Sequence, residues 1–194
     1  MRRMQKGWIC YNHFEIVRWS GYFLYKQFLP GEYVKDIYQI TPDTLIAQGI
    51  KGIMTDLDNT LVEWDRPEAT PEVIEWMNRM RDAGLKVIVV SNNHEPRVST
   101  FCQPAGIPFI FEAKKPLGKG FSNALRLMGL PKEEVVMIGD QLLTDILGGN
   151  RFGVRTILVI PVAKSDGFVT RFNRKVERRI MKGLKRRGML DWEE

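Results

Sequence analysis

The sequence is poor in cysteine and histidine. Its 194 residues include two cysteines, Cys10 and Cys102, and two histidines, His13 and His94. The cysteines lie far apart without a CxxC spacing, which favours free thiols in a reducing cytosol over a disulfide framework. The histidines are too few and too far apart to form a metal cluster. These absences argue against a disulfide-stabilised secreted domain and against a histidine-based metal site.

A long apolar run is also missing. No segment approaches the roughly 20 apolar residues that a membrane-spanning helix needs, and the apolar run Trp19–Tyr25 is bounded by Arg18 and Lys26. The basic start, Met1 to Arg3, is followed by charged residues and by no small-residue cleavage site, so we do not expect a signal peptide. The sequence therefore predicts a cytoplasmic protein.

The composition is that of an ordinary soluble domain, with 44% apolar and 27% charged residues. The net charge of +6 is unevenly spread: residues 171–187 hold nine Lys or Arg and the single acid Glu177, a net +8, which leaves the rest of the chain at −2. We therefore divide the chain into an aromatic-rich N-terminal arm with a short helix (1–48), a core (49–163) and a basic amphipathic tail (164–194).

Capping and turn signals divide the core into alternating strands and helices. Thr41-Pro42-Asp43 predicts a short helix that Gly49 ends, and Thr70-Pro71-Glu72 predicts a longer helix that Gly84 ends. The expected strands are 52–56, 85–90, 107–111, 135–139 and 154–160, and further helices are expected from Pro96, over 118–128 and over 142–147. This alternation predicts an α/β fold with a doubly wound, mainly parallel sheet.

Polar side chains follow the ends of these strands, where open parallel sheets bind their ligands. They are Asp56 and Asp58, Ser91 to Asn93, Lys114 and Lys115, and Asp140 and Asp145. An Asp carboxylate can attack a phosphate ester to give an aspartyl-phosphate, and a second acid two residues on can transfer the proton. Because nucleophile and substrate are both anionic, the attack needs a cation, and Mg²⁺ suits carboxylate, carbonyl and water ligands. Each segment alone also has a plain reading as a turn, a helix N-cap or a solvated lysine.

Together, four segments resemble the haloacid dehalogenase (HAD) superfamily. They are Asp56-Leu57-Asp58-Asn59-Thr60, similar to the motif DxDxT; Val87–Val90 with Ser91-Asn92-Asn93; Lys115-Pro116; and Gly139–Asp145, similar to GDxxxxD. The segments appear in the order of the family's motifs, at successive strand ends, over roughly residues 50–160. The resemblance implies a Rossmann-like phosphatase core.

The resemblance also implies a role for each acid. Asp56 would be the nucleophile and a Mg²⁺ ligand, and Asp58 would be the proton donor and acceptor, with its main-chain carbonyl on the metal. Asp140 would complete the metal site, and Asp145 would support it. An acid at position 58 favours hydrolysis over slow phosphate transfer.

Three further residues would bind the phosphoryl group by the same resemblance. They are Ser91, Asn92 and Lys115. Lys114 competes with Lys115 for this role, and we choose Lys115 because it directly precedes Pro116 at the entry to a helix.

The spacing of the motifs leaves no room for a cap domain. One helix and one strand use up the chain between Asp58 and Ser91, and the same holds between Ser91 and Lys115. We therefore expect an open site that suits a bulky substrate, or one covered by another subunit. The oligomeric state stays open, and a dimer is compatible with this arrangement.

The basic tail has one apolar helical face among its charges. Its members are Val169, Phe172, Val176, Ile180 and Leu184. Such a helix, residues 169–187, could lie on anionic phospholipid as a peripheral contact at the inner membrane face. Alternatively, its apolar face packs on the core with the charges in solvent, or the charges bind nucleic acid.

From about residue 27 to the end, the chain resembles the capless, YqeG-type phosphatases of HAD subfamily IIIA. The segments that carry this resemblance include TDLDNTLVEWDRPEATP and SNNHEPRV. That group is similar to enzymes that dephosphorylate phosphatidylglycerophosphate. The first hypothesis is thus a Mg²⁺-dependent phosphatase of a lipid phosphate. The alternatives are a phosphatase of nucleic-acid ends or of a soluble phosphometabolite, and a non-catalytic interaction protein with the HAD fold.

Overall fold

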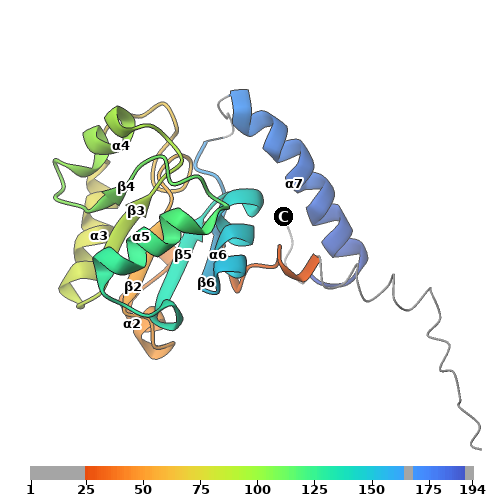
Figure 1. The fold of residues 1–194 in the computed structure, drawn as a ribbon, viewed down its shortest axis with the longest axis horizontal. Coiled ribbons are helices and arrows are strands. Elements are labelled where there is room, and N and C mark those ends of the chain that lie inside the picture. The colour runs from red at the N-terminus through yellow and green to blue at the C-terminus, as the bar shows by residue number, and fades with distance from the viewer. Residues whose placement is uncertain (1–24, 164–167, 191–194) are drawn as a thin grey trace, which may run out of the picture.

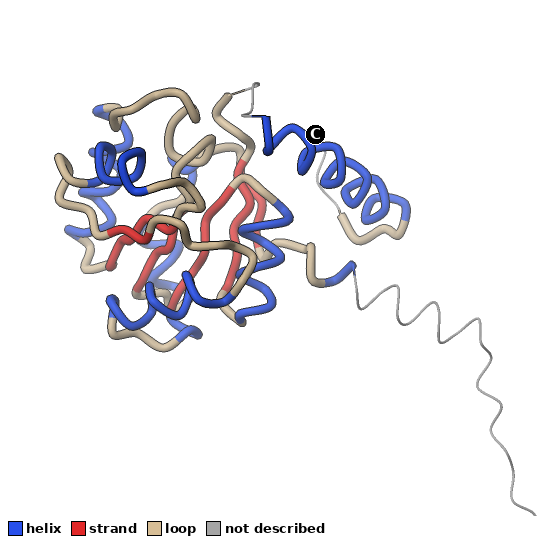
Figure 2. The backbone as a smooth tube through the Cα atoms, turned by 45° about the horizontal axis from the view of Figure 1, so that its top comes forward, coloured by secondary structure: helices blue, strands red, loops and turns tan. Residues whose placement is uncertain are grey.

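The computed structural model describes residues 25–163 and 168–190, without the side chains of 168–172. These residues form one parallel sheet that helices cover on both faces (Figures 1 and 2). The strands are β1 (Glu32–Val34), β2 (Gly52–Thr55), β3 (Lys86–Val90), β4 (Phe109–Ile110), β5 (Val135–Gly139) and β6 (Arg155–Val159). The helices are α2 (Pro42–Ala47), α3 (Pro71–Asp82), α4 (Glu95–Cys102), α5 (Gly118–Met128), α6 (Leu147–Phe152) and α7 (Phe168–Arg186). The strand order is β1-β6-β5-β2-β3-β4, with every pair parallel. The predicted α/β class is confirmed.

Successive residues of each central strand enter opposite hydrophobic layers. In β2, Ile53 packs with α3 and α4, and Met54 packs with α5 on the other face. In β3, Val87 and Val89 share the layer of Ile53, and Ile88 the layer of Met54. Because both faces are apolar, these strands read as continuous hydrophobic runs, as expected for a doubly covered parallel sheet.

The site forms where the direction of winding reverses. From β2 the chain runs outward through β3 to β4, and β5 and β6 then fill the other side of β2. Thr55 is paired with Ile138, so Asp56 and Gly139 follow at neighbouring strand ends. The main-chain N–H of Asp56 donates to the Ile138 carbonyl at 2.9 Å. Ligands of open parallel sheets bind at such a reversal.

No cap domain interrupts the core. Between Asp58 and Ser91 the chain forms only a short loop, α3 and β3, and between Ser91 and Lys115 it forms only α4 and β4. The predicted capless architecture is therefore present.

Three elements differ from the sequence-based expectation. β1, Glu32–Val34, lies within the segment predicted to be an arm, and it pairs with β6 at the edge of the sheet. β4 covers only Phe109–Ile110, because it borders the sheet and pairs with β3 alone. The predicted helix 142–147 begins as a π-helical turn, Leu142–Ile146, which runs into α6. The remaining part of the predicted arm, residues 1–24, lies outside the described residues.

The tail forms the helix α7, which runs beside the side of the sheet that β1 and β6 form (Figure 1). Of its predicted apolar face, Leu184 is buried, and Val176 and Ile180 are half-buried. The side chains of Val169 and Phe172 lie outside the described residues. Within the described ranges, no helix has the length and apolar character to cross a membrane.

Gly120 permits close packing of α5 on the loop that leads to Lys115. A Cβ at Gly120 would lie 2.7 Å from the carbonyl oxygen of Ala113 and 2.8 Å from its Cβ.

Substituting glycine by alanine in an exposed helix normally stabilises the protein by about 1 kcal/mol, whereas overpacking against backbone costs about 1–3 kcal/mol. We predict that Gly120→Ala lowers the free energy of unfolding, measured by urea denaturation. The control is Ser122→Ala, an exposed position on the same helix, which should leave stability unchanged or slightly raised. An unchanged or higher urea midpoint for Gly120→Ala would contradict the packing.

Candidate active site

Asp56 stands at the centre of a buried charge cluster at the carboxyl end of β2. Its side chain is 8% exposed, and its Oδ1 lies 2.9 Å from the Nζ of Lys115. The same Nζ lies 2.7 Å from the Oδ1 of Asp145, which is fully buried. Burial opposes the charged form of Lys115, but Asp145 and Asp56 outweigh it and raise the pKa of this lysine. Lys115 is thus a fixed positive charge beside the predicted nucleophile.

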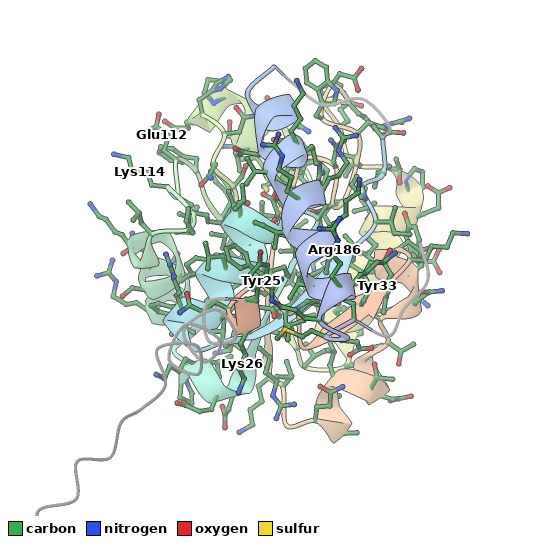
Figure 3. The ribbon with its side chains drawn as sticks, turned by 90° about the vertical axis from the view of Figure 1, so that its right-hand side faces the viewer. Tyr25, Lys26, Tyr33, Glu112, Lys114 and Arg186 are labelled. Atoms are coloured by element: carbon green, nitrogen blue, oxygen red, sulfur yellow. The ribbon has the colours of Figure 1, made fainter. Side chains whose placement is uncertain are left out.

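The loop that carries Lys115 is held by Asn92. The Asn92 side-chain amide donates to the Lys115 carbonyl at 3.0 Å, and its oxygen accepts from the Lys115 N–H at 2.7 Å. Lys114, the competing lysine, is exposed and points outward with Glu112 in Figure 3. The geometry thus distinguishes the two lysines. It also gives the Asn92 side chain a task in placing Lys115, while its role as a phosphate ligand stays a prediction.

Asp58 is held by two residues that follow β3. Its Oδ2 accepts from the Nδ2 of Asn93 at 2.9 Å, and its Oδ1 lies 2.9 Å from the Nη2 of Arg97. Arg97 also donates to the carbonyl of Pro67 at 3.1 Å. Burial raises the pKa of Asp58, as does the Asp56 carboxylate, while the Asn93 and Arg97 contacts lower it. A raised pKa suits a carboxyl group that must carry a proton.

Ser91 lies at the end of β3, next to these groups. It is 1% exposed, and its hydroxyl accepts from the Asn93 N–H at 3.1 Å. Its main chain is tied to the neighbouring strand by the hydrogen bond from Ser91 N–H to the Ile110 carbonyl at 2.9 Å. The structure thus brings Ser91 to the same edge as Asp56, and its contact with phosphate stays a prediction.

Asp140 follows β5 and is buried among other polar groups. Its Oδ1 accepts from the Thr60 hydroxyl at 3.0 Å, and its Oδ2 pairs with the guanidinium of Arg174, which comes from α7. Burial raises the pKa of Asp140 to about 8, with Arg174 opposing the rise and the carboxylates of Asp56 and Asp145 adding to it.

Asp145 lies one turn further on and is packed tightly. Its Oδ2 accepts from the Gln141 N–H at 3.1 Å, and a Cβ at Gly139 would lie 2.3 Å from its Cγ. Only glycine at position 139 therefore admits this carboxylate. Burial raises the pKa of Asp145 to about 6, against the lowering effect of Lys115.

Three of these carboxylates could hold a metal ion. Asp56, Asp140 and Asp145 each offer an oxygen, and these atoms lie within 4.8 Å of one another. Oxygen ligands of this kind suit Mg²⁺, and buried carboxylates at such separation repel one another unless cations compensate them. The donor set therefore fits a divalent cation. The sequence-based metal set named Asp58 through its main-chain carbonyl in place of the Asp145 carboxylate, and that assignment stays a prediction.

An apolar groove borders this cluster. It has a volume of about 340 Å³ and runs between α7, β1 and β6, with Asp140 and Arg174 in its lining. The other lining residues are Tyr33, Leu142, Leu158, Val159, Ile160, Pro161, Glu177, Arg178 and Met181. In Figure 3, Tyr25 and Tyr33 lie on either side of α7. The lining of the groove thus combines apolar side chains with cationic and anionic groups.

Sequence reasoning gave no individual role to five residues of this arrangement. They are Thr60, Asn93, Arg97, Arg174 and Glu177. The first three lie inside or next to recognised motifs, and this closeness in sequence could have identified them as candidates for the site. Glu177 is the only acid among residues 171–187, and such an exception could have indicated a buried ion pair. Nothing in the sequence near Arg174 indicates that it reaches Asp140.

Comparison with known proteins places this geometry in a family. A family model for haloacid dehalogenase-like hydrolases matches residues 16–153. The chain is 63% identical to the "Probable phosphatase YqeG" of Bacillus subtilis (strain 168) over 171 residues, which cover 88% of this chain and 99% of that protein.

More distant similarity extends to lipid phosphatases. The chain is 29% identical to phosphatidylglycerophosphate phosphatase 1, chloroplastic/mitochondrial, of Arabidopsis thaliana, over 83% of this chain and 49% of that protein. It is 31% identical to the chloroplastic enzyme of Chlamydomonas reinhardtii, over 71% of this chain and 54% of that protein. The chain thus spans about half the length of these two relatives. Among solved structures, NagD of E. coli K-12 aligns with a TM-score of 0.50 at 17% identity, over 59% of this chain and 90% of that one, a likeness in fold alone.

The raised carboxyl pKa values give a pH dependence that can be measured. The unfolded chain releases these protons near the ordinary value of 3.8, whereas folded Asp145 and Asp140 hold them up to about 6 and about 8. Metal-free protein should therefore lose stability as pH rises through this window, because the folded state binds more protons. A cation must displace the same protons. We predict that Mg²⁺ raises the melting temperature more at about pH 8 than at about pH 5.5, measured against EDTA. An equal shift at both pH values would contradict this prediction.

Proposed function

Because this chain is a phosphatase of the haloacid dehalogenase-like hydrolase family, we propose that it hydrolyses a lipid phosphomonoester, phosphatidylglycerophosphate, with Mg²⁺ and through an aspartyl-phosphate. The observation that carries the chemistry is the pairing of Asp56 with Lys115, with Asp58 two residues away in a separate set of contacts. Asp56 lies beside Lys115 and Asp58 lies beside Arg97, and we assign the nucleophilic attack to Asp56 and the proton transfer to Asp58.

The first step transfers the phosphoryl group to Asp56. A carboxylate oxygen of Asp56 forms a bond to phosphorus while the bond from phosphorus to the ester oxygen breaks. Asp58, in its protonated form, gives its proton to the departing oxygen. Lys115 lies against Asp56 and stabilises the charge that spreads over the phosphoryl oxygens. The products of this step are the free alcohol and phospho-Asp56.

The second step returns the enzyme to its starting state. Asp58, now a carboxylate, takes a proton from water, and the resulting nucleophile attacks phosphorus and releases Asp56 and inorganic phosphate. In the structure Asn93 and Arg97 contact the two oxygens of Asp58. Asp56, Asp140 and Asp145 would hold Mg²⁺, which supplies charge compensation for the approach of an anionic nucleophile to an anionic ester.

Four observations support a lipid as the ester. Among the described residues no cap domain covers the site, so a large substrate is not excluded by a closed chamber. The apolar groove under α7 borders Asp140 and could take the part of the lipid next to its phosphate. The similarity to two phosphatidylglycerophosphate phosphatases points the same way. On α7 the side chains of Lys175, Arg178, Arg179 and Lys182 are exposed, which is compatible with contact to an anionic membrane surface at the inner face.

The activity itself is tested with lipid and soluble esters side by side. We predict Mg²⁺-dependent phosphate release from phosphatidylglycerophosphate, reduced at least about a thousandfold in Asp56→Asn, because the amide cannot act as the nucleophile. Asp65→Asn, an exposed acid outside the cluster, is the matched control and should keep wild-type activity. Cleavage of soluble esters or nucleic-acid ends without cleavage of the lipid would reject the lipid assignment. No release from any ester in the panel would favour a non-catalytic protein.

The groove is tested by placing a charge in it. Ile160 lines the groove and is 43% exposed, so Ile160→Asp should fold. We predict that this change lowers kcat/KM for the lipid about tenfold, because the apolar part of the substrate loses its contact, and leaves cleavage of a small soluble ester unchanged. Ile46→Asp, at a residue 48% exposed on α2, is the control. Equal losses on both substrates would show that the groove does not bind the lipid.

A further inference from the structure

The helix α7 places a cation on a carboxylate that could bind metal. The Nη2 of Arg174 contacts Asp140 Oδ2, and its Nη1 donates to the main-chain carbonyl of Asp140 at 2.7 Å. The Arg174 side chain is 17% exposed, and the Asp140 side chain is fully buried. The guanidinium of Arg174 thus lies against Asp140 where the carboxylate cluster would receive a divalent cation.

The position of Arg174 is itself fixed by a buried acid. Glu177 is 4% exposed, and its Oε2 lies 3.1 Å from the Nη1 of Arg174. Its other oxygen accepts from the N–H of Leu143 at 3.1 Å, in the turn between Asp140 and Asp145. The helix is therefore joined to the metal-binding turn by two groups, a cation on the carboxylate and an anion on the main chain. Other charged side chains of α7, such as Lys175 and Arg179, face solvent.

Both oxygens of Asp140 already have donors in this arrangement. Thr60 donates to Oδ1 at 3.0 Å, and Arg174 occupies Oδ2. A divalent ion on Oδ2 would meet the guanidinium at close range, where two positive charges repel strongly because little water screens them. A cation that binds Asp140 through Oδ2 therefore competes with Arg174 for that oxygen.

We propose that Arg174 is a positioning residue that sets the affinity of the carboxylate cluster for its divalent cation. The inference rests on the metal requirement of the proposed function. In the metal-free protein Arg174 is paired with Asp140 and keeps α7 on the turn that carries it. When the cation binds, the guanidinium leaves Oδ2 while Glu177 retains it nearby. The tail helix thus acts on the site from outside the four recognised motifs.

The proposal extends to the helix through linkage. If cation binding removes the contact between Arg174 and Asp140, it also weakens the attachment of α7 to the core. Consider a ligand that binds the exposed basic side of α7 and favours the detached helix. This ligand would raise the affinity for the cation, and the cation would raise the affinity for this ligand by the same factor. Hydrogen exchange of the α7 amides reports this directly, and we expect faster exchange with Mg²⁺ than with EDTA.

The decisive experiment measures Mg²⁺ binding by calorimetry in the full chain. Arg174→Gln should lower the Kd about tenfold relative to wild type, the size of a typical coupling between two ligands. Arg174→Lys keeps the positive charge but loses the two-pronged guanidinium, so its Kd should lie between those of the wild type and Arg174→Gln. Arg179→Gln removes the same charge from an exposed position on the same helix and should change the Kd by less than about twofold.

The result that overturns the proposal is a Kd for Arg174→Gln that equals or exceeds that of Arg179→Gln. In that case Arg174 either plays no part or holds Asp140 ready for the metal. Circular dichroism of each variant checks folding, and the increase in melting temperature with Mg²⁺ gives a second reading of affinity. Because binding is measured without substrate, the outcome is independent of which ester is cleaved. Tighter binding in Arg174→Gln together with an inactive wild type would reject the proposed function and keep this inference.

Discussion

The buried ammonium of Lys115 is the group on which the rest of the site depends. Its side chain is 1% exposed and lies between Asp56 and Asp145. A buried charge is tolerated only when opposite charges compensate it, and removing either partner leaves the other uncompensated. The position of Lys115 is set by the Asn92 amide and by the close approach of α5 at Gly120. The ends of β2, β3 and β5 must therefore all be in place before these charges balance.

The cluster is completed by cations from three separate parts of the chain. Asp56 and Asp145 share Lys115, Asp58 pairs with Arg97 from α4, and Asp140 pairs with Arg174 from α7. This division keeps the two carboxylates at 56 and 58 in different surroundings. Asp56 lies against the fixed charge of a lysine, while burial raises the pKa of Asp58. Two acids two residues apart can thus take the separate roles of nucleophile and proton carrier.

The sequence predicts the parts of this protein that depend on local or periodic signals. The strands β2, β3, β5 and β6 are buried on both faces and appear as apolar runs, and Thr70 and Gly84 mark the ends of α3. Strand β1 escaped prediction because three residues at a sheet edge carry little apolar pattern, and only their pairing with β6 defines them.

In the site, too, the sequence predicts some residues and not others. The motif residues could be listed from their order alone, but their partners could not. Arg97 reaches Asp58 across a loop, and Arg174 reaches Asp140 from a helix that reads as a surface element. Such contacts depend on how α4 and α7 pack. The most direct test of the account is to trap phospho-Asp56 in Asp58→Asn with an aryl phosphate, whose leaving group departs without a proton from residue 58, so that the variant forms the intermediate but clears it slowly. After rapid quenching with substrate and Mg²⁺, mass spectrometry should find one phosphoryl group on the peptide that contains residue 56. Phosphoryl transfer to another residue, or turnover by Asp56→Asn at the wild-type rate, would contradict the account.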